Sequence, residues 1–378
     1  MSQNLSTQSR NPSPVPSEQP GGAPEPQTAL LLYATISDVR YFAALLRGVN
    51  FSGRATVTMT KAGMIVAVED ARTLLGSAYV FAECFDQFVY TPASTSRAST
   101  QQTQDPGKGN NTDTNTAFEI PLSTLVECLN IFGTATTKDT EKKTRRWRRI
   151  GEDSDDDHQQ EGNSHHRQRE APASNGRIDH HFGNTKLTGV RISYAGAGHP
   201  LEFVIVDPSD GATATVELTT FDAEPQLALP FDSDKTVLKV ILKSSWLRDA
   251  LSELDPSCDK LTIMGNPPQQ QGRTQRGAQR RLRLRAVGTF GSTEMDYPND
   301  REVLETCECE NAVSFSYSFK HISKALKALQ SSSKTSLRID EDGLLSLQFL
   351  MPAPKVRANG AGDAFIEFRC LALDDGVA

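Results

Sequence analysis

The sequence predicts an α+β fold in which four strand-helix-strands units form two similar halves. In each unit, apolar and polar residues first alternate as in a strand. Apolar residues then recur at helical spacing, and further alternating segments follow. This order occurs four times. Each predicted helix has one apolar side, so it must cover one face of an antiparallel sheet. Residues 222–235 separate the second unit from the third and are expected to form an exposed connector.

The composition limits the class of protein. The 378 residues include 40 Lys and Arg and 47 Asp and Glu, a net charge of −7, and 37% are hydrophobic. An acidic chain is not drawn to nucleic acid by its total charge, so any such contact must come from a local patch. The sequence shows neither a signal peptide nor a run of about 18 apolar residues, so we expect a soluble intracellular protein without membrane contact.

The six cysteines are scattered along the chain. Cys307 and Cys309 are separated by one residue, which is not the two-residue gap of a zinc knuckle. We interpret all six as reduced thiols and predict neither a metal site nor a cofactor.

Four stretches are predicted to be disordered because their composition cannot bury a core. They are the tail 1–28 and the inserts 92–116, 134–186 and 266–280. What remains is an N-terminal domain in 29–221 and a C-terminal domain in 236–378.

The first unit begins with a strand in residues 29–36. Apolar spacing predicts a helix that Ser37 opens and Gly48 ends. Two strands joined by a tight turn at Gly63 follow, and one long aromatic strand over residues 75–91 completes the sheet.

The other units repeat this order. Strand leads into helix at residues 117–133, 236–255 and 313–330. After the third helix we predict strands over residues 260–265, 281–290 and 303–311.

Two of the predicted helices carry a basic stripe beside their apolar side. Lys320, Lys324 and Lys327 lie at i, i+4 and i+7 of the helix Phe319 to Gln330, and Arg40 and Arg47 lie on an adjoining side of the first helix. Charge runs of this kind usually face water, which is the alternative interpretation. If the four helices faced the centre of a ring, these cations would attract phosphates without reading bases.

The insert 134–186 contains a basic run next to an acidic one. The basic run is a candidate nuclear-import signal, and Ser154 beyond it is a possible kinase site; the alternative is a disordered insert whose charges keep it soluble. The paired histidines His165, His166, His180 and His181 are weak candidates for metal binding in such a stretch. The basic residues are Lys142, Lys143, Arg145, Arg146, Arg148 and Arg149.

Several blocks resemble the Rad-one subunits of the nine-one-one DNA-damage checkpoint clamp. They are ISDVRYFAALLRGVNFSGRATVTMTKAGMIVAVEDA, LSTLVECLNIFG, LRDALSELD, STEMDYP and LRIDEDGLLSLQFL. The resemblance implies the fold of PCNA-type sliding clamps, with helices inside and antiparallel sheets outside. It also implies a heterotrimeric ring on double-stranded DNA with Rad-nine-like and Hus-one-like partners, a replication-factor-C-like loader, and checkpoint signalling and DNA repair in the nucleus.

The resemblance assigns residues 222–235 as the connector near which clamps bind client peptides, with Leu227, Leu229 and Phe231 as its apolar residues. The sequence departs from an evenly basic pore, because the helices in residues 123–132 and 245–254 have little positive face.

Two other functions compete with a non-catalytic clamp. Members of the family it resembles are described as 3′ to 5′ exonucleases, and phosphodiester cleavage by metal ions needs converging carboxylates. The candidates are Glu69-Asp70 and Asp340-Glu341-Asp342, at strand ends or in a turn where acids are common, and 153–157 in an insert. A protein-binding scaffold with solvated lysines is the third possibility.

Overall fold

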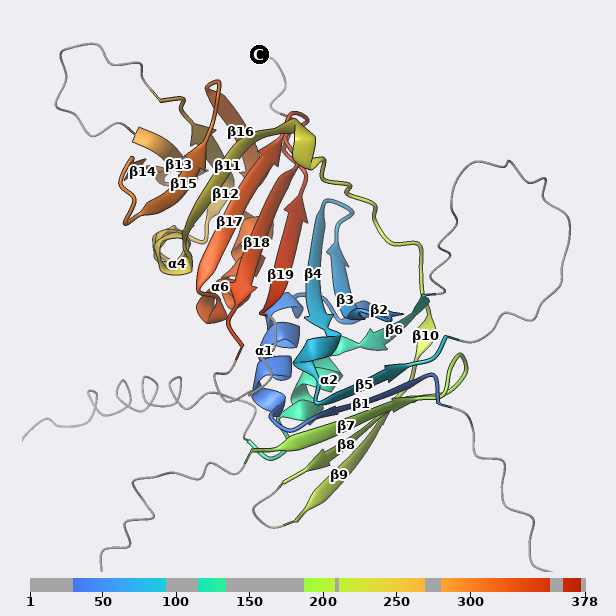
Figure 1. The fold of residues 1–378 in the computed structure, drawn as a ribbon. Coiled ribbons are helices and arrows are strands. Elements are labelled where there is room, and N and C mark those ends of the chain that lie inside the picture. The colour runs from blue at the N-terminus through green and yellow to red at the C-terminus, as the bar shows by residue number, and fades with distance from the viewer. Residues whose placement is uncertain are drawn as a thin grey trace, which may run out of the picture.

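A computed structural model describes residues 30–92, 115–133, 187–207, 211–268, 280–353 and 363–374 (Figure 1). It contains four repeats of strand, helix and strands. None of the described helices is long and apolar enough to span a bilayer.

The first two repeats form one half of the molecule. The first consists of β1 (Leu32–Ile36), α1 (Val39–Val49), β2 (Arg54–Thr60), β3 (Gly63–Asp70), β4 (Leu74–Phe81), the 3₁₀ turn η1 (Ala82–Cys84) and β5 (Gln87–Tyr90). The second consists of β6 (Thr116–Pro121), α2 (Leu122–Leu129), β7 (Gly189–Tyr194), β8 (Leu201–Val206), β9 (Thr213–Leu218) and β10 (Phe221–Asp222).

The last two repeats form the other half. The third consists of η3 (Ser233–Lys235), β11 (Thr236–Lys243), α4 (Ser244–Glu253), β12 (Cys258–Gly265), β13 (Arg280–Gly288), β14 (Gly291–Pro298) and β15 (Leu304–Glu308). The fourth consists of β16 (Val313–Ser318), the helical run α5 (Phe319–Ile322), η4 (Ser323–Ala325) and α6 (Leu326–Ser331), then β17 (Lys334–Asp340), β18 (Leu345–Met351) and β19 (Ala364–Cys370).

Three antiparallel sheets organise these strands. Their orders are β5-β1-β7-β8-β9, β10-β6-β2-β3-β4-β19-β18-β17-β11-β15 and β14-β13-β12-β16. The ten-stranded sheet crosses from one half to the other where β4 pairs with β19, from Tyr79 opposite Phe365 to Leu74 opposite Cys370 (Figure 1). Because a continuous hydrogen-bonded ladder joins them, the two halves share one sheet.

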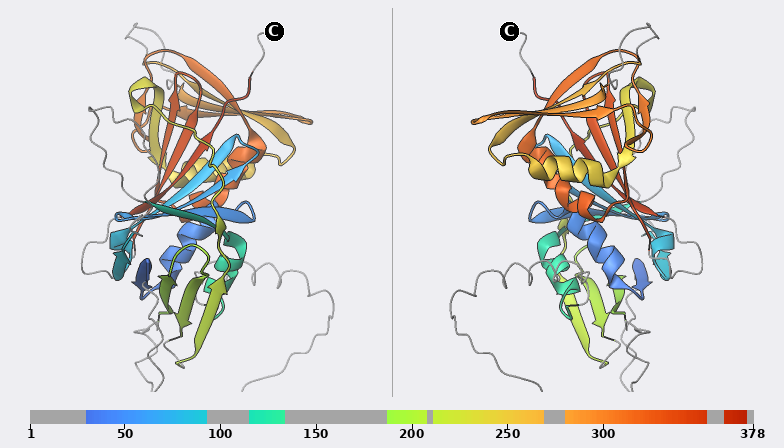
Figure 2. Two further views of the ribbon diagram at one scale, coloured as in Figure 1. Left: turned by 90° about the vertical axis from the view of Figure 1, so that its right-hand side faces the viewer. Right: turned by 90° about the vertical axis from the view of Figure 1, so that its left-hand side faces the viewer.

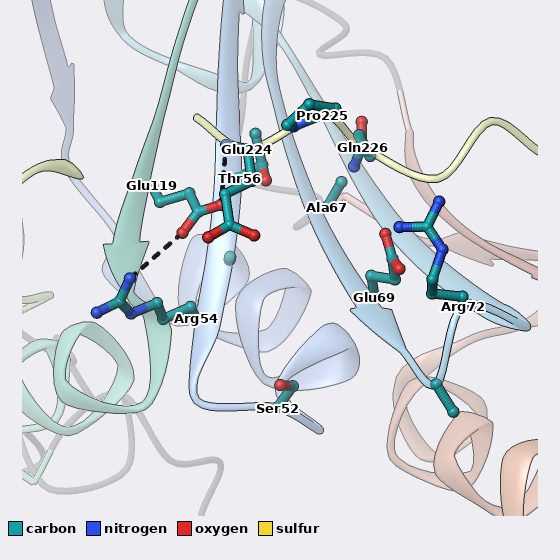
Figure 3. Close-up of a pocket in the computed structure, with 12 residues that line it drawn as sticks. Ser52, Arg54, Thr56, Ala67, Glu69, Arg72, Glu119, Glu224, Pro225 and Gln226 are labelled. Carbon is teal, nitrogen blue, oxygen red and sulfur yellow. Dashed lines mark hydrogen bonds and ion pairs between the residues drawn. The ribbon is translucent and has the colours of Figure 1, made fainter. Parts of the chain in front are cut away.

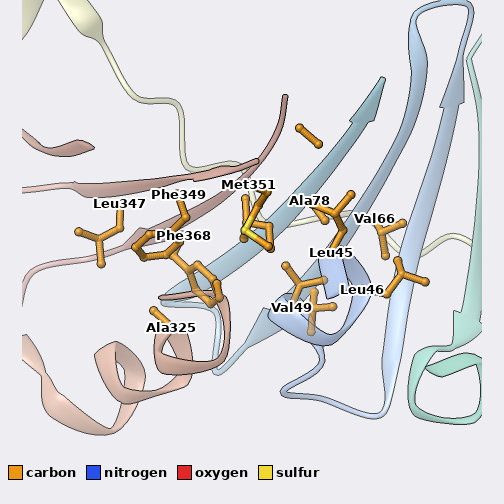
Figure 4. Close-up of a cluster of buried hydrophobic side chains, with 14 of the residues drawn as sticks. Leu45, Leu46, Val49, Val66, Ala78, Ala325, Leu347, Phe349, Met351 and Phe368 are labelled. Atoms are coloured by element: carbon orange, nitrogen blue, oxygen red, sulfur yellow. The ribbon is translucent and has the colours of Figure 1, made fainter. Parts of the chain in front are cut away.

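The helices form a row on one side of the sheets. Helix α1 packs against α2 on one side and α6 on the other, and α6 packs in turn against α4, so the order is α2, α1, α6, α4 (Figure 2). Side chains from both halves meet beneath this row in one core, among them Leu45 and Val49 of α1 and Phe349 and Phe368 of the facing strands (Figure 4). The phenol of Tyr41 also ties the halves, since it donates to Met351 O at 2.7 Å and accepts from Ala364 N at 2.8 Å.

The prediction of one long strand over residues 75–91 is wrong, because this part of the chain forms two strands, β4 and β5. The turn η1 interrupts it, and the buried ring of Phe85 lies 6.1 Å from the ring of Phe42 and 5.0 Å from that of Phe88. The chain leaves the ten-stranded sheet at this turn, and β5 pairs with β1 instead.

Three further element predictions need correction. The strands predicted for the third unit do not include β14, which occupies Gly291–Pro298. Helix α1 begins after Asp38, whose carboxylate accepts from Arg40 N at 3.0 Å, and Gly48 lies within the helix and does not end it. The helix predicted from Phe319 to Gln330 exists as a helical run, but with a 3₁₀ turn in its middle.

Candidate nucleic-acid interface

The lysine stripe lies on the α5–η4–α6 run, next to α1. Lys320 and Lys327 are exposed, whereas the side chain of Lys324 is 18% exposed. Lys327 Nζ donates to Asn50 O at the end of α1, at 2.9 Å. The two outer lysines of the stripe are therefore exposed, whereas the central one is largely covered.

Asp70, at the end of β3, is the ion-pair partner of Lys324. Its carboxylate forms an ion pair with Lys324, and its Oδ2 lies 3.6 Å from His321 Nε2. His321 Nδ1 lies 3.3 Å from Thr73 Oγ1, and Lys324 Nζ lies 5.3 Å from the centre of the Phe51 ring. We call Asp70, Thr73, His321 and Lys324 the junction cluster, because it joins the first repeat to the fourth.

Sequence reasoning missed Asp70 as a partner of the lysine stripe. The two residues of the ion pair are 254 positions apart, so no local spacing connects them. Burial lowers the pKa of His321, the charge of Lys324 lowers it further, and Asp70 raises it. Neutral imidazole is thus favoured inside this cluster.

The arginines of α1 differ from each other. Arg40 donates from Nε and Nη2 to the Asp38 carboxylate at 2.9 and 2.8 Å, and this hydrogen bonding raises the pKa of Arg40. Arg47 is half-buried, and burial lowers its pKa. Arg40 thus brings its own counter-charge to the row of helices.

The other two helices add little positive charge, as the sequence indicates. Helix α2 contains Glu127 and neither Lys nor Arg. In α4, Arg248 Nη2 lies 2.8 Å from Asp249 Oδ1, so the pair is neutral. The exposed lysines of the row, Lys320 and Lys327, both lie on the α5–η4–α6 run, and Lys327 is next to the end of α1.

The connector crosses the other side of the ten-stranded sheet with its apolar side chains turned inward. Leu229 is buried, and Leu227 and Phe231 pack beside it against a patch of Ala67, Leu75 and Leu344. The intervening residues Gln226, Ala228 and Pro230 are exposed.

Carboxylates hold the first part of the connector. Leu227 N donates to Glu69 Oε2 at 3.0 Å, and Glu224 N donates to Glu119 Oε1 at 3.2 Å. Between the connector and the sheet lies a cavity of about 320 Å³, with Arg54 beside Glu119 and Arg72 beside Glu69 (Figure 3).

A buried charge network holds the last part of the connector. Glu367, 2% exposed, accepts from Ser346 Oγ at 2.7 Å and pairs with Arg338 and Arg369 at 3.3 and 2.8 Å. Arg369 Nη1 donates to Leu229 O at 2.8 Å, and the Arg338 guanidinium lies 4.6 Å from the centre of the Phe231 ring. The network thus connects the sheet to the backbone and to one ring of the connector.

The acidic residues considered for metal-dependent cleavage have structural partners. Asp340 is buried and accepts from Asp342 N and Leu344 N at 3.1 and 2.8 Å, which closes the turn after β17. Glu341 pairs with Lys235, and Glu69 and Asp70 bind the connector and Lys324. Over the described ranges, no three His, Cys, Asp or Glu side chains gather as metal ligands would.

Several predicted residues lie outside the described part of the chain. They are the import candidates Lys142, Lys143, Arg145, Arg146, Arg148 and Arg149, the acidic run 153–157 with Ser154, and His165, His166, His180 and His181. The six cysteines are all described, and all are free thiols.

Comparison with known proteins finds relatives that are named as checkpoint or repair proteins and that align with most of the chain. The chain is 27% identical to the mouse "Cell cycle checkpoint protein RAD1" over 340 residues, which cover 90% of this chain and 91% of the mouse protein. It is 28% identical to "DNA damage checkpoint control protein rad1" of Schizosaccharomyces pombe, over 89% of this chain and 84% of the relative. It is 26% identical to "DNA repair exonuclease REC1" of Mycosarcoma maydis, over 93% and 98%.

The match to a family covers most of the two halves. Residues 31–351 match the family described as "Repair protein Rad1/Rec1/Rad17". This range includes all of the first three repeats and the fourth up to the end of β18. The chain therefore belongs to the Rad1/Rec1/Rad17 family of repair proteins.

Proposed function

We propose that this chain is one subunit of a heterotrimeric, ring-shaped DNA clamp that acts as a non-catalytic platform in DNA-damage checkpoint signalling and repair. The observation that carries the proposal is the row α2, α1, α6, α4 on one side of the sheets, with the exposed Lys320 and Lys327 on one of its members. In a ring of PCNA type this row is the inner wall. Point charges there contact the phosphate backbone of double-stranded DNA and leave the base edges unread.

The proposed clamp domains are residues 29–221 and 236–378, and the free strand edges suggest how neighbours attach. Strands β9 and β14 end two of the sheets and are six and eight residues long. Strand β10 has two residues, and β16 is bonded at its edge by Leu373 N, which donates to Ser316 O at 2.7 Å. Long unpaired edges accept a further strand. We assign β9 and β14 to Rad-nine-like and Hus-one-like neighbours.

The connector side is the proposed platform for the loader, which resembles replication factor C, and for client peptides. The inward side chains of Leu227, Leu229 and Phe231 build the wall of such a platform. The exposed residues Ala228 and Pro230 between them would contact a peptide. The proposed site of action is the nucleus, and a fluorescent fusion whose residues Lys142 to Arg149 are replaced tests the import signal.

The test of the clamp is topological. The chain is co-expressed with its two partner chains, and native mass spectrometry is expected to find a 1:1:1 complex. Loaded onto a closed circular DNA, the complex stays bound through a high-salt wash and slides off once the circle is cut. A monomer or homo-oligomer, or equal loss from circular and linear DNA, would contradict the proposal.

A 3′ to 5′ exonuclease is the second candidate, and the name of the Mycosarcoma maydis relative favours it. The purified complex is assayed on end-labelled DNA with and without added magnesium. Activity that disappears in Asp340→Asn and Asp342→Asn, while the unfolding temperature stays unchanged, would support this candidate against the clamp. Because Asp340 closes a turn, we expect its replacement to lower stability instead.

A further inference from the structure

We propose that Asp70 sets how tightly the clamp holds DNA, because it withholds the positive charge of Lys324 from the phosphate backbone. This inference rests on the proposed function. It assigns to an acid of β3 a role in DNA binding that the sequence pattern assigns only to lysines.

The first step is the placement of the three lysines. Lys320, Lys324 and Lys327 all lie on the α5–η4–α6 run of the helix row, spaced four and three residues apart. Lys320 and Lys327, on either side, are exposed, and Lys324 between them is not. A lysine in the middle of an exposed basic face would ordinarily extend into water.

The second step is the set of contacts that keep the Lys324 ammonium group from extending into solvent. Its ammonium group forms the ion pair with Asp70 and lies over the Phe51 ring, and Asp70 is in turn within 3.6 Å of His321. Within the described residues, the ion pairs of Lys324 involve this one carboxylate. The Asp70 side chain is 33% exposed, so the pair lies near the surface and the lysine can exchange partners without crossing the core.

The third step is the competition with DNA. A phosphate oxygen and the Asp70 carboxylate are alternative acceptors for the same ammonium group. As long as Asp70 is charged, the clamp makes one phosphate contact fewer than its lysine count suggests. Such a counter-charge favours sliding, because every phosphate contact must break and re-form as the ring moves.

The experiment measures the salt dependence of DNA binding by the assembled heterotrimer. Each added phosphate contact steepens the slope of log affinity against log salt by about 0.9. The ratio of Asp70→Asn affinity to parent affinity is therefore expected to rise about threefold as salt falls from about 200 mM to about 50 mM. In a Lys324→Met background the same Asp70→Asn change leaves the slope unaltered.

The matched control frees a lysine elsewhere. Glu341→Gln removes the carboxylate that pairs with Lys235 at the end of the connector, away from the helix row, and is expected to leave the slope as in the parent. An equal change of slope in Asp70→Asn and Glu341→Gln, or none in Asp70→Asn, would overturn the inference. A parent complex without salt-dependent retention would instead contradict the proposed function.

A second measurement does not depend on the folding of a variant. Amine-reactive labelling followed by mass spectrometry reports the access to each lysine of the parent complex. Lys324 is expected to react more slowly than Lys320 and to change little when DNA is bound, whereas DNA protects Lys320 and Lys327. If DNA protected Lys324 as strongly as Lys320, this would show that Asp70 does not keep the Lys324 ammonium group from the DNA phosphates.

Discussion

Gly48 of α1 lies against Ala328 of α6, where the two halves of the molecule meet. A Cβ atom added at Gly48 would lie 3.4 Å from Ala328 Cβ and only 2.4 Å from Ile366 Cδ1. The side-chain tip of Ile366 on β19 therefore occupies the space that a Cβ atom at Gly48 would need. This contact brings the first and fourth repeats, and with them the two basic stripes, side by side.

Replacing Gly48 by Ala is expected to lower the free energy of unfolding by about 1 kcal/mol, because overpacking at Ile366 exceeds the gain in helix propensity. The double variant Gly48→Ala with Ile366→Val lacks the clashing methyl group. Its loss of unfolding free energy should be about 1 kcal/mol smaller than the sum of the losses in the two single variants. Chemical denaturation of all four proteins measures this, and strict additivity would show that Ile366 Cδ1 is not the obstacle.

Lys320 and Lys327 are expected to contribute separately to DNA retention. Replacing either with Met should reduce the slope of log affinity against log salt by about 0.9 while the heterotrimer still assembles. Lys235→Met, at the connector, is the control and should leave the slope unchanged. Retention that survives both replacements would mean that this face of the α5–η4–α6 run does not meet the phosphates.

His321 is expected to make the junction cluster sensitive to acid. Its pKa is lowered in the folded state, with Asp70, Thr73, Lys320 and Lys324 around it, so the unfolded chain binds a proton at a higher pH than the folded chain does. Stability contributed by neutral His321 is present above the unfolded pKa near 6.5 and is lost as pH falls toward the folded pKa.

The unfolding temperature of the parent should therefore fall more than that of His321→Gln between about pH 7.5 and about pH 5.5. The replacement of His199, which is exposed in a hairpin turn, by Gln serves as control. An equal fall in parent and His321→Gln would show that the imidazole is not protonated differently on unfolding.

Glu367 is expected to be needed for the path of the connector. Glu367→Gln keeps the shape of the side chain but leaves Arg338 and Arg369 without their buried carboxylate, a change that costs about 3–5 kcal/mol. Hydrogen exchange should then increase over residues 227–231, where Arg369 holds Leu229 O. The exposed Glu294 of β14, which pairs with Arg283 of β13, is the control, and its replacement by Gln should cost less than about 1 kcal/mol.

If exchange over the connector stays unchanged in Glu367→Gln while stability falls, the network supports the sheet alone. Equal destabilisation by the two replacements would show that burial does not distinguish Glu367 from a surface acid.

The sequence by itself determined the features that depend on a short local period along the chain. The apolar spacing of each helix, the alternation of the strands and the i, i+4, i+7 stripe of Lys320, Lys324 and Lys327 are local properties, so they predict the four repeats and the basic face. The sequence also shows a glycine at position 48, but it does not show that Ile366 occupies the space beside it.

Only the tertiary structure decided which distant groups share a site. Asp70 meets Lys324 across 254 residues, β5 belongs to a different sheet from β4, and Glu367 reaches the connector through two arginines. Ion pairs and sheet edges depend on where the strands of the two halves come together. Sequence spacing carries no information about such contacts, because the energy that selects them comes from burial and charge pairing in the assembled fold.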